Sequence, residues 1–137
     1  MAKLTLELEE SYDFQLIGIS CHVKDYRISW EINQHLNFDL IKDESLSLHI
    51  KEEEQRFTFF SYWQEDEFAE YYLIGNRSDN GTLIPEESTA DYFMLIKGHV
   101  SSQEVKSLAE KINKLKPVLT AYVIEVDNLK SKANLVF

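Results

Sequence analysis

The stretch RFTFFSYWQEDEFAEYYLIGN, residues 56–76, predicts the central architecture of the chain. Two segments rich in aromatic and aliphatic residues flank the polar sequence QEDE, and such segments are typical of strands. The preceding LSLHI (46–50) alternates apolar and polar residues, and KEEEQ (51–55) follows it as a charged turn. We therefore expect two successive hairpins, which form an antiparallel meander.

Further segments extend this prediction in both directions. KLTLELEE (3–10), DFQLIGIS (13–20), YFMLIKG (92–98) and VLTAYVIEV (118–126) are strand candidates, and RSDNGT (77–82) is a turn. KDYRISWEINQHL (24–36) and SSQEVKSLAEKINKLKP (101–117) have helical periodicity, and Ser101 with Glu104 forms a capping box in the second. The fold class is α+β, with an antiparallel sheet of about five to six strands, two principal helices and one domain over 1–137.

Helix 24–36 and the aromatic ribbon 57–72 each carry apolar side chains on two sides. A helix of this kind must be covered twice, either inside the domain or by a partner subunit. We therefore expect a homodimer or an unknown protein partner, and we expect truncation of Trp30 or Leu108 to alanine to cost about 2–5 kcal/mol. The candidate interface residues are Tyr26, Trp30, Phe60, Tyr62 and Trp63.

The net charge of −10 excludes several classes of partner. Nucleic acids and anionic membranes bind through basic side chains, so neither is an expected partner. No segment resembles a signal peptide or a membrane span, which favours a cytoplasmic protein. The acidic excess lies in residues 1–96, whereas residues 97–137 carry more basic than acidic side chains. This asymmetry predicts either a solvated helix face or a charge-complementary contact, for example between two copies of the chain.

Catalytic and metal-binding motifs are absent from the sequence. It has no glycine-rich phosphate loop, no HExxH, no CxxC pair and no GxSxG, and its four histidines are scattered. Cys21 follows the apolar segment LIGIS, which favours a buried and inert thiol. We expect no metal and no cofactor, and the sequence favours a protein that is not an enzyme.

The segment IPEESTADYF, residues 84–93, carries the best candidate for a polar site. Pro85 is conformationally restricted, and Glu86 and Asp91 lie five residues apart across an expected turn. If the two carboxylates converge in a closed space, one of them has a raised pKa and can act as a general acid, with Arg27 beside them. Alternatively, Asp91 accepts backbone N–H groups or pairs with Arg27, while Glu86 is solvated.

Residues 84–86 (IPE), a three-residue spacer and residues 90–92 (ADY) resemble the signature of the IPExxxVDY family of small bacterial proteins. Ala90 stands where the signature has valine. The segments LIGIS, KDYRISW and NLVF are also similar to that family, so the resemblance covers nearly the whole chain. It implies one compact domain, and the family has no assigned activity.

Two functions follow from these patterns. The leading hypothesis is a non-catalytic interaction or structural module that associates with itself. The alternative is a small-molecule-binding domain or enzyme that uses a carboxylate site around Glu86 and Asp91 together with Arg27.

Overall fold

Strands and helices are segregated along the described chain, as the α+β prediction requires, because six strands follow one another between the two α-helices. The computed structural model describes residues 14–137, so the strand predicted over 3–10 lies outside the described residues. The helices are α2 (Asp25–Leu36) and α3 (Ser102–Asn113), with short 3-10 turns at Pro85–Glu87, Val126–Asn128 and Lys132–Leu135. The strands are β1 (Gln15–Ser20), β2 (Ile41–Lys42), β3 (Leu46–Ile50), β4 (Glu53–Phe57), β5 (Phe59–Gln64), β6 (Ala69–Gly75), β7 (Tyr92–Gly98) and β8 (Thr120–Ile124).

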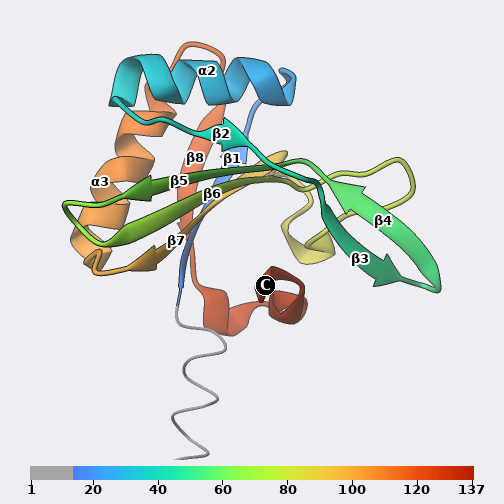
Figure 1. Ribbon diagram of the computed structural model, residues 1–137. Coiled ribbons are helices and arrows are strands. Elements are labelled where there is room, and N and C mark those ends of the chain that lie inside the picture. Colours follow the sequence, from blue (N-terminus) through green and yellow to red (C-terminus); the bar gives the residue numbers. More distant parts are fainter. Residues whose placement is uncertain (1–13) are drawn as a thin grey trace, which may run out of the picture.

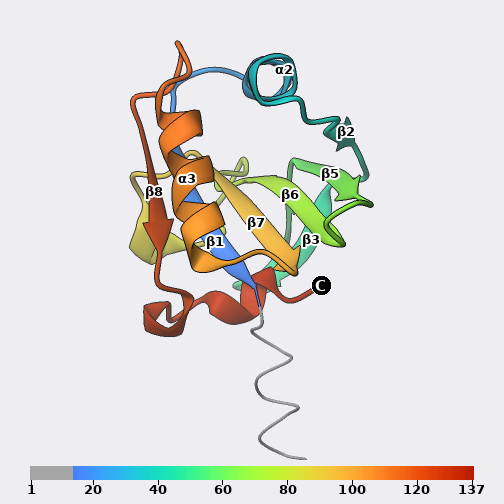
Figure 2. The ribbon, with the colours of Figure 1, turned by 90° about the vertical axis from the view of Figure 1, so that its left-hand side faces the viewer.

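A six-stranded antiparallel sheet in the order β2-β5-β6-β7-β1-β8 organises the molecule (Figure 1). Both predicted hairpins form, as β3–β4 and β5–β6, and the antiparallel sheet of about six strands is confirmed. The two hairpins do not share a strand, however, and the meander consists of β5, β6 and β7 (Figure 2). The hairpin β3–β4 is a separate two-stranded sheet that projects to one side (Figure 1). The chain leaves it at Thr58, so the first hairpin does not continue into the main sheet.

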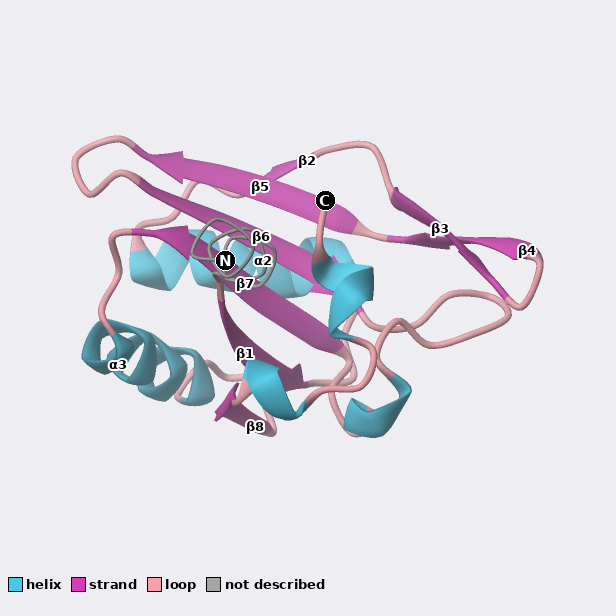
Figure 3. Cartoon of the chain, turned by 90° about the horizontal axis from the view of Figure 1, so that it is seen from below, coloured by secondary structure: helices cyan, strands magenta, loops and turns pink. Residues whose placement is uncertain are grey.

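Both faces of the sheet are covered. Figure 1 shows α2 above the sheet and the C-terminal segment below it, and Figure 3 shows the C-terminal segment from its own side. Side chains alternate between the two faces of a strand. In β7, Tyr92, Met94 and Ile96 join the helix-side core, whereas Phe93 and Leu95 join the core on the opposite face. This double burial explains why the segment YFMLI is apolar at every position.

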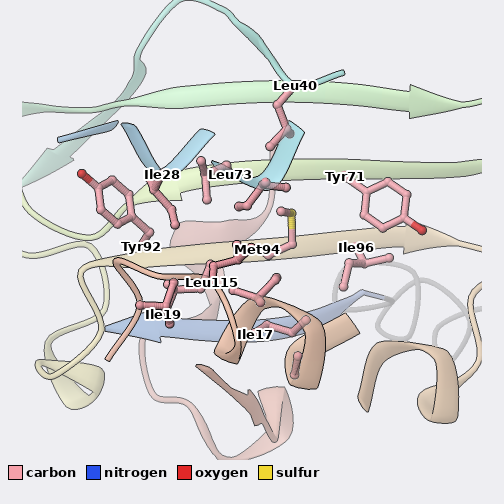
Figure 4. Packing of buried hydrophobic residues seen from close by; sticks show 14 of the residues in the cluster. Ile17, Ile19, Ile28, Leu40, Tyr71, Leu73, Tyr92, Met94, Ile96 and Leu115 are labelled. Carbon is pink, nitrogen blue, oxygen red and sulfur yellow. The ribbon is translucent and has the colours of Figure 1, made fainter. Parts of the chain in front are cut away.

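The helix-side core holds the two helices against the sheet. Figure 4 shows Ile17, Leu73 and Met94 from three strands in one cluster with Ile28 of α2. Val105, Ala109 and Ile112 of α3 pack into the same cluster. In α3 the capping box forms as predicted: Ser101 Oγ accepts the N–H of Glu104, and the Glu104 carboxylate accepts the N–H of Ser101. No helix within residues 14–137 is long and apolar enough to cross a membrane.

Only one of the two apolar stripes on α2 is buried. Ile28 and Ile32 lie in the core, but Tyr26 is 67% exposed and Trp30 is 52% exposed. The prediction that the domain itself could cover both stripes is therefore wrong, and cover by a partner stays a prediction. The expected cost of truncating Trp30 is also corrected, because its side chain is half in solvent, and Leu108 is only half-buried.

The aromatic ribbon divides in a similar way. Phe60 is fully packed in the helix-side core, which removes it from the candidate interface. Tyr62 is half-buried, and its ring stacks on Tyr71 at 5.8 Å between centroids. Trp63 remains exposed at the end of β5. Of the five candidate interface residues, Tyr26, Trp30 and Trp63 therefore have free surface, with Tyr62 partly accessible.

Paired alanine variants on the two helices test this assignment of buried and exposed faces. Ile112→Ala removes a fully buried side chain of α3 and should lower the free energy of unfolding by about 2–5 kcal/mol. Trp30→Ala should lower it by less than about 1 kcal/mol, because the exposed part of the indole loses no packing. Urea unfolding followed by circular dichroism measures both, and an equal loss would contradict the assignment.

Candidate functional site

The side chain of Asn76 holds the segment 84–90 in place. Asn76 is completely buried at the end of β6. Its Nδ2 donates to the carbonyl oxygens of Glu87, at 3.0 Å, and Ala90, at 2.8 Å, and its Oδ1 accepts the N–H of Ile84 at 2.8 Å. Three backbone groups of a non-strand segment thus find their partners on one amide. A buried backbone group without a partner would cost free energy, so this contact makes the burial of the segment possible.

The apolar residues of the same segment enter the second core. Ile84 and Ala90 are fully buried there, whereas Pro85 begins a single 3-10 turn at the surface. Sequence reasoning missed this role of Asn76, which is only the last residue of the segment 56–76 predicted to form strands. The signal was present, because Asn76 follows directly on the apolar strand residues YYLIG, where a polar side chain must find internal partners.

Asp91 serves the backbone at the start of β7. Its Oδ2 accepts the N–H of Cys21 at 2.9 Å, and its Oδ1 accepts Nε of Arg77 at 3.1 Å. The predicted bond to a backbone N–H is confirmed. The basic partner is Arg77 rather than Arg27, and Arg77 also donates to the carbonyl oxygen of Ser88 at 2.6 Å.

Tyr92 completes this connection to the start of α2. Its hydroxyl donates to the carbonyl oxygen of Val23 at 2.7 Å. Asp91 and Tyr92 therefore fix residues 21–23, immediately before α2 begins at Asp25. Asp25 is bound in turn, because its Oδ2 accepts the Thr58 hydroxyl at 2.6 Å and Nζ of Lys42 at 3.1 Å.

Glu86 is exposed, as the alternative interpretation expected, and its carboxylate is also bound to the C-terminal segment. Its carboxylate accepts the N–H of Ser131 at 2.6 Å and the Ser131 hydroxyl at 2.9 Å. Partial burial raises the pKa of Glu86, but the hydrogen bonds from the backbone and hydroxyl of Ser131 outweigh it, and the pKa lies below its ordinary value. A carboxyl group with a lowered pKa is an acceptor at neutral pH, and it is a poor general acid.

Glu87 connects the segment to the edge strand β8. The Tyr122 hydroxyl donates to Oε1 of Glu87 at 3.1 Å and lies 3.3 Å from Oγ1 of Thr89. The Tyr122 ring lies against Gly18 of β1, where a Cβ atom would approach the ring to 2.8 Å. Glycine at this position therefore makes room for the ring that carries the hydroxyl.

The three predicted site residues have separate partners. Glu86 binds Ser131, Asp91 binds Cys21 and Arg77, and Arg27 binds Glu31. Within residues 14–137, no hydrogen bond or ion pair joins any two of the three, and no buried polar side-chain atom lacks a partner. The same part of the chain contains no group of three His, Cys, Asp or Glu side chains that could hold a metal ion. The carboxylates of the segment therefore hold the fold together.

Cys21, whose backbone N–H binds Asp91, has a buried thiol, as the sequence predicted. Burial raises its pKa to about 11; the N–H of Val23 opposes this shift, and the nearby Asp91 carboxylate adds to it. The reactive thiolate is therefore scarce at neutral pH.

An open cleft between α2 and α3 offers a different kind of surface. Its volume is about 1000 Å³. The apolar part of its lining comes from Trp30, Leu36, Phe38, Leu108 and Leu115. The polar part consists of Arg27, Glu31, Gln34, His35, Asn37, Lys111, Lys114 and Lys116. Four Lys or Arg side chains thus face one carboxylate, in a protein whose net charge is −10.

The one carboxylate of the cleft is already paired. Glu31 is buried, and its Oε2 lies 3.0 Å from Nη2 of Arg27, while its Oε1 lies 3.4 Å from Nε2 of His35. Arg27 also lies over the Trp30 ring, 5.9 Å from its centroid. Glu31 therefore orders Arg27 and His35 along the α2 side of the cleft.

The lysines on the α3 side are not paired in this way. Within the described chain, no ion pair or hydrogen bond engages the ammonium groups of Lys111, Lys114 or Lys116. Lys111 and Lys114 are both exposed. Their charges are consequently available to an incoming anionic group.

A smaller hollow of about 340 Å³ continues the cleft toward β5 and β6. It shares Leu36, Asn37, Phe38, Leu108 and Lys111 with the larger one. Its far side carries the carboxylates of Glu67 and Glu104. The combined groove is therefore basic at the end between the helices and acidic at the other end.

Comparison with protein-family models and with curated proteins finds no match to this chain. The resemblance to the IPExxxVDY family thus stays a prediction, and the functional argument depends on the geometry described above.

Replacing Asn76 tests whether it supports the segment. Asn76→Ala removes the side-chain partner of the Ile84 N–H and of the Ala90 carbonyl, while the Glu87 carbonyl keeps the N–H of Ala90, and it should lower the free energy of unfolding by about 3 kcal/mol or more. Asn80→Ala, in the exposed turn, is the matched control and should change it by less than about 0.5 kcal/mol. Urea denaturation measures both, and similar values for the two variants would refute the role of Asn76.

Thiol labelling tests the environment of Cys21. With iodoacetamide at pH 8, the folded protein should react about 100-fold more slowly than the urea-unfolded chain, because the raised pKa suppresses the thiolate. Equal rates would show that the thiol is accessible and ionised in the folded state.

Proposed function

We propose that the protein is a non-catalytic interaction module and that the α2–α3 cleft binds an acidic protein segment that carries apolar side chains. The observation that carries this proposal is the composition of the cleft. Within residues 14–137, Lys111, Lys114 and Lys116 have no ion-pair partner, and they lie beside the apolar residues Trp30 and Leu108 on a molecule that is otherwise strongly acidic.

Charge favours a locally acidic partner over a nucleic acid. A long polyanion must follow the surface beyond the cleft, where the net charge of the protein repels it. A short acidic segment needs only the cleft itself. Opposite charges at the rim of such a surface mainly increase the association rate and the specificity.

The shape of the cleft favours a protein segment over a small metabolite. Small-molecule sites enclose most of their ligand, whereas this cleft is open along the two helices. Its apolar residues, including the half-buried Leu36 and Leu108, can accept side chains of a partner. Buried aromatic and arginine side chains contribute most of the affinity at protein interfaces, and Trp30 and Arg27 both line this cleft.

The arrangement gives less support to the alternative carboxylate site. Glu86 and Asp91 both accept backbone N–H groups, and neither lines the cleft. Glu31, which does line it, is paired at both of its oxygens.

A peptide titration tests the proposed binding surface. The probe is a short synthetic peptide that alternates Glu with Phe and Leu, added to dilute ¹⁵N-labelled full-length protein. We expect saturable shifts of the Trp30 indole signal and of the Leu108 and Lys111 amides, with binding that weakens as salt increases. Lys111→Glu combined with Lys114→Glu should weaken binding at least about tenfold, because it replaces attraction by repulsion.

Two controls make this titration specific. Lys106→Glu changes a lysine on the same helix that does not line the cleft, and binding should stay within about twofold of wild type. A peptide with Lys in place of Glu should not bind. Shifts confined to other surfaces, or equal losses for the two protein variants, would refute the proposal.

A further inference from the structure

The turn between β5 and β6 is acidic and aromatic, and it is therefore chemically complementary to the basic, partly apolar cleft. We call residues 63–68, Trp63 to Phe68, the acidic tip. Glu65, Asp66 and Glu67 follow one another in it and are all exposed. Trp63 and Phe68 flank them with half or more of each side chain in solvent, and their rings lie edge to face, 6.3 Å apart. Few surface turns combine three carboxylates with two large exposed aromatic residues, because the aromatic groups gain nothing from exposure.

The backbone of the acidic tip is held in an unfavourable conformation. Phe68 has a φ of 51°, in the left-handed region that bulky residues rarely adopt. The turn is closed by the N–H of Phe68, which donates to the carbonyl oxygen of Glu65 at 3.2 Å. Gly98, at a φ of 110°, allows the close approach of the Phe68 carbonyl on the neighbouring strand. Strain of this kind persists at binding sites, where a presented side chain repays it.

We propose that the partner segment of the cleft is the acidic tip of a second copy of this chain. The proposal rests on the proposed function of the cleft as a surface for acidic, apolar segments. The carboxylates of Glu65, Asp66 and Glu67 meet Lys111, Lys114 and Lys116, and the aromatic rings of the tip meet the apolar residues of the cleft. The charged groups of both surfaces are exposed in the single chain, as are Trp30 of the cleft and both aromatic residues of the tip.

The positions of the two surfaces allow a closed, reciprocal dimer. Glu67 of the acidic tip lines the smaller hollow together with Leu108 and Lys111 of the cleft, so tip and cleft are neighbours in the chain itself. When two complementary patches are adjacent, a twofold axis between them places each tip in the cleft of the other copy. Glu67 then takes part in the contact as a residue of the tip, and each incoming tip meets the lysine end of the other copy's groove rather than Glu104, which would repel it.

Charge reversal on each surface provides the test, read by sedimentation equilibrium of the full chain. The cleft variant carries Lys111→Glu and Lys114→Glu, and the tip variant carries Glu65→Lys and Glu67→Lys. Wild type should dimerise, with an affinity that falls as salt increases. Each variant alone should weaken dimerisation at least about tenfold, because like charges then meet at both contacts. An equimolar mixture should restore it, because the hybrid pairs an acidic tip with a basic cleft and a basic tip with an acidic cleft.

Matched controls have the same charge changes at other places. Lys106→Glu lies on α3 outside the cleft, and Glu52→Lys with Glu53→Lys lies on the acidic β3–β4 turn. Both should dimerise as wild type does. Circular dichroism of every variant establishes that it is folded before its association is compared.

Three outcomes would overturn this inference. The wild-type chain could remain monomeric at high concentration, both charge reversals could leave the affinity of the dimer unchanged, or the mixture of the two variants could fail to restore association. The peptide titration with dilute protein is independent of these three outcomes, because it does not require dimerisation. A chain that binds the peptide but stays monomeric therefore has a different protein as its partner. A cleft that fails to bind the peptide refutes the proposed function itself.

Discussion

The three hydrogen bonds of the Asn76 side chain are the interaction on which the rest of the structure depends. They satisfy the backbone of residues 84–90 where no strand is available to do so. Ile84 and Ala90 can then enter the second core, and the chain reaches β7 in the register that its neighbours require. Strand β7 carries apolar side chains on both faces, so an error at its start would expose half of them.

The residues that follow this segment, Asp91 and Tyr92, determine where α2 lies, and therefore the shape of the cleft. Asp91 and Tyr92 bind residues 21 and 23 immediately before the helix, and Asp25 binds Thr58 and Lys42 at its first turn. The polar residues that suggested a catalytic loop thus act at a distance from the proposed binding surface. They position the helix that presents Arg27 and Trp30 to α3.

The periodicity of the sequence predicted much of this fold, because strands and helices follow local rules. The antiparallel sheet, the capping box at Ser101 and the burial of Cys21 are examples. Three features required information about tertiary contacts. Asp91 meets Arg77 rather than Arg27, Phe60 points into the core rather than toward a partner, and Trp30 stays exposed because only one side of α2 meets the sheet. The cleft could not be predicted from the sequence for the same reason. Arg27 and Lys111 lie far apart in the sequence, and the packing of the two helices brings them together.

The central claim is that the segment 84–92 is a structural joint that supports the cleft. Native-state hydrogen exchange of the Ile84 amide tests it most directly, since the Asn76 side chain is the one acceptor of this N–H within residues 14–137. The account predicts that the Ile84 amide exchanges only with global unfolding, at the same free energy of opening as the Met94 amide at the centre of β7. Rapid exchange of Ile84 through local opening, while Met94 remains protected, would contradict it.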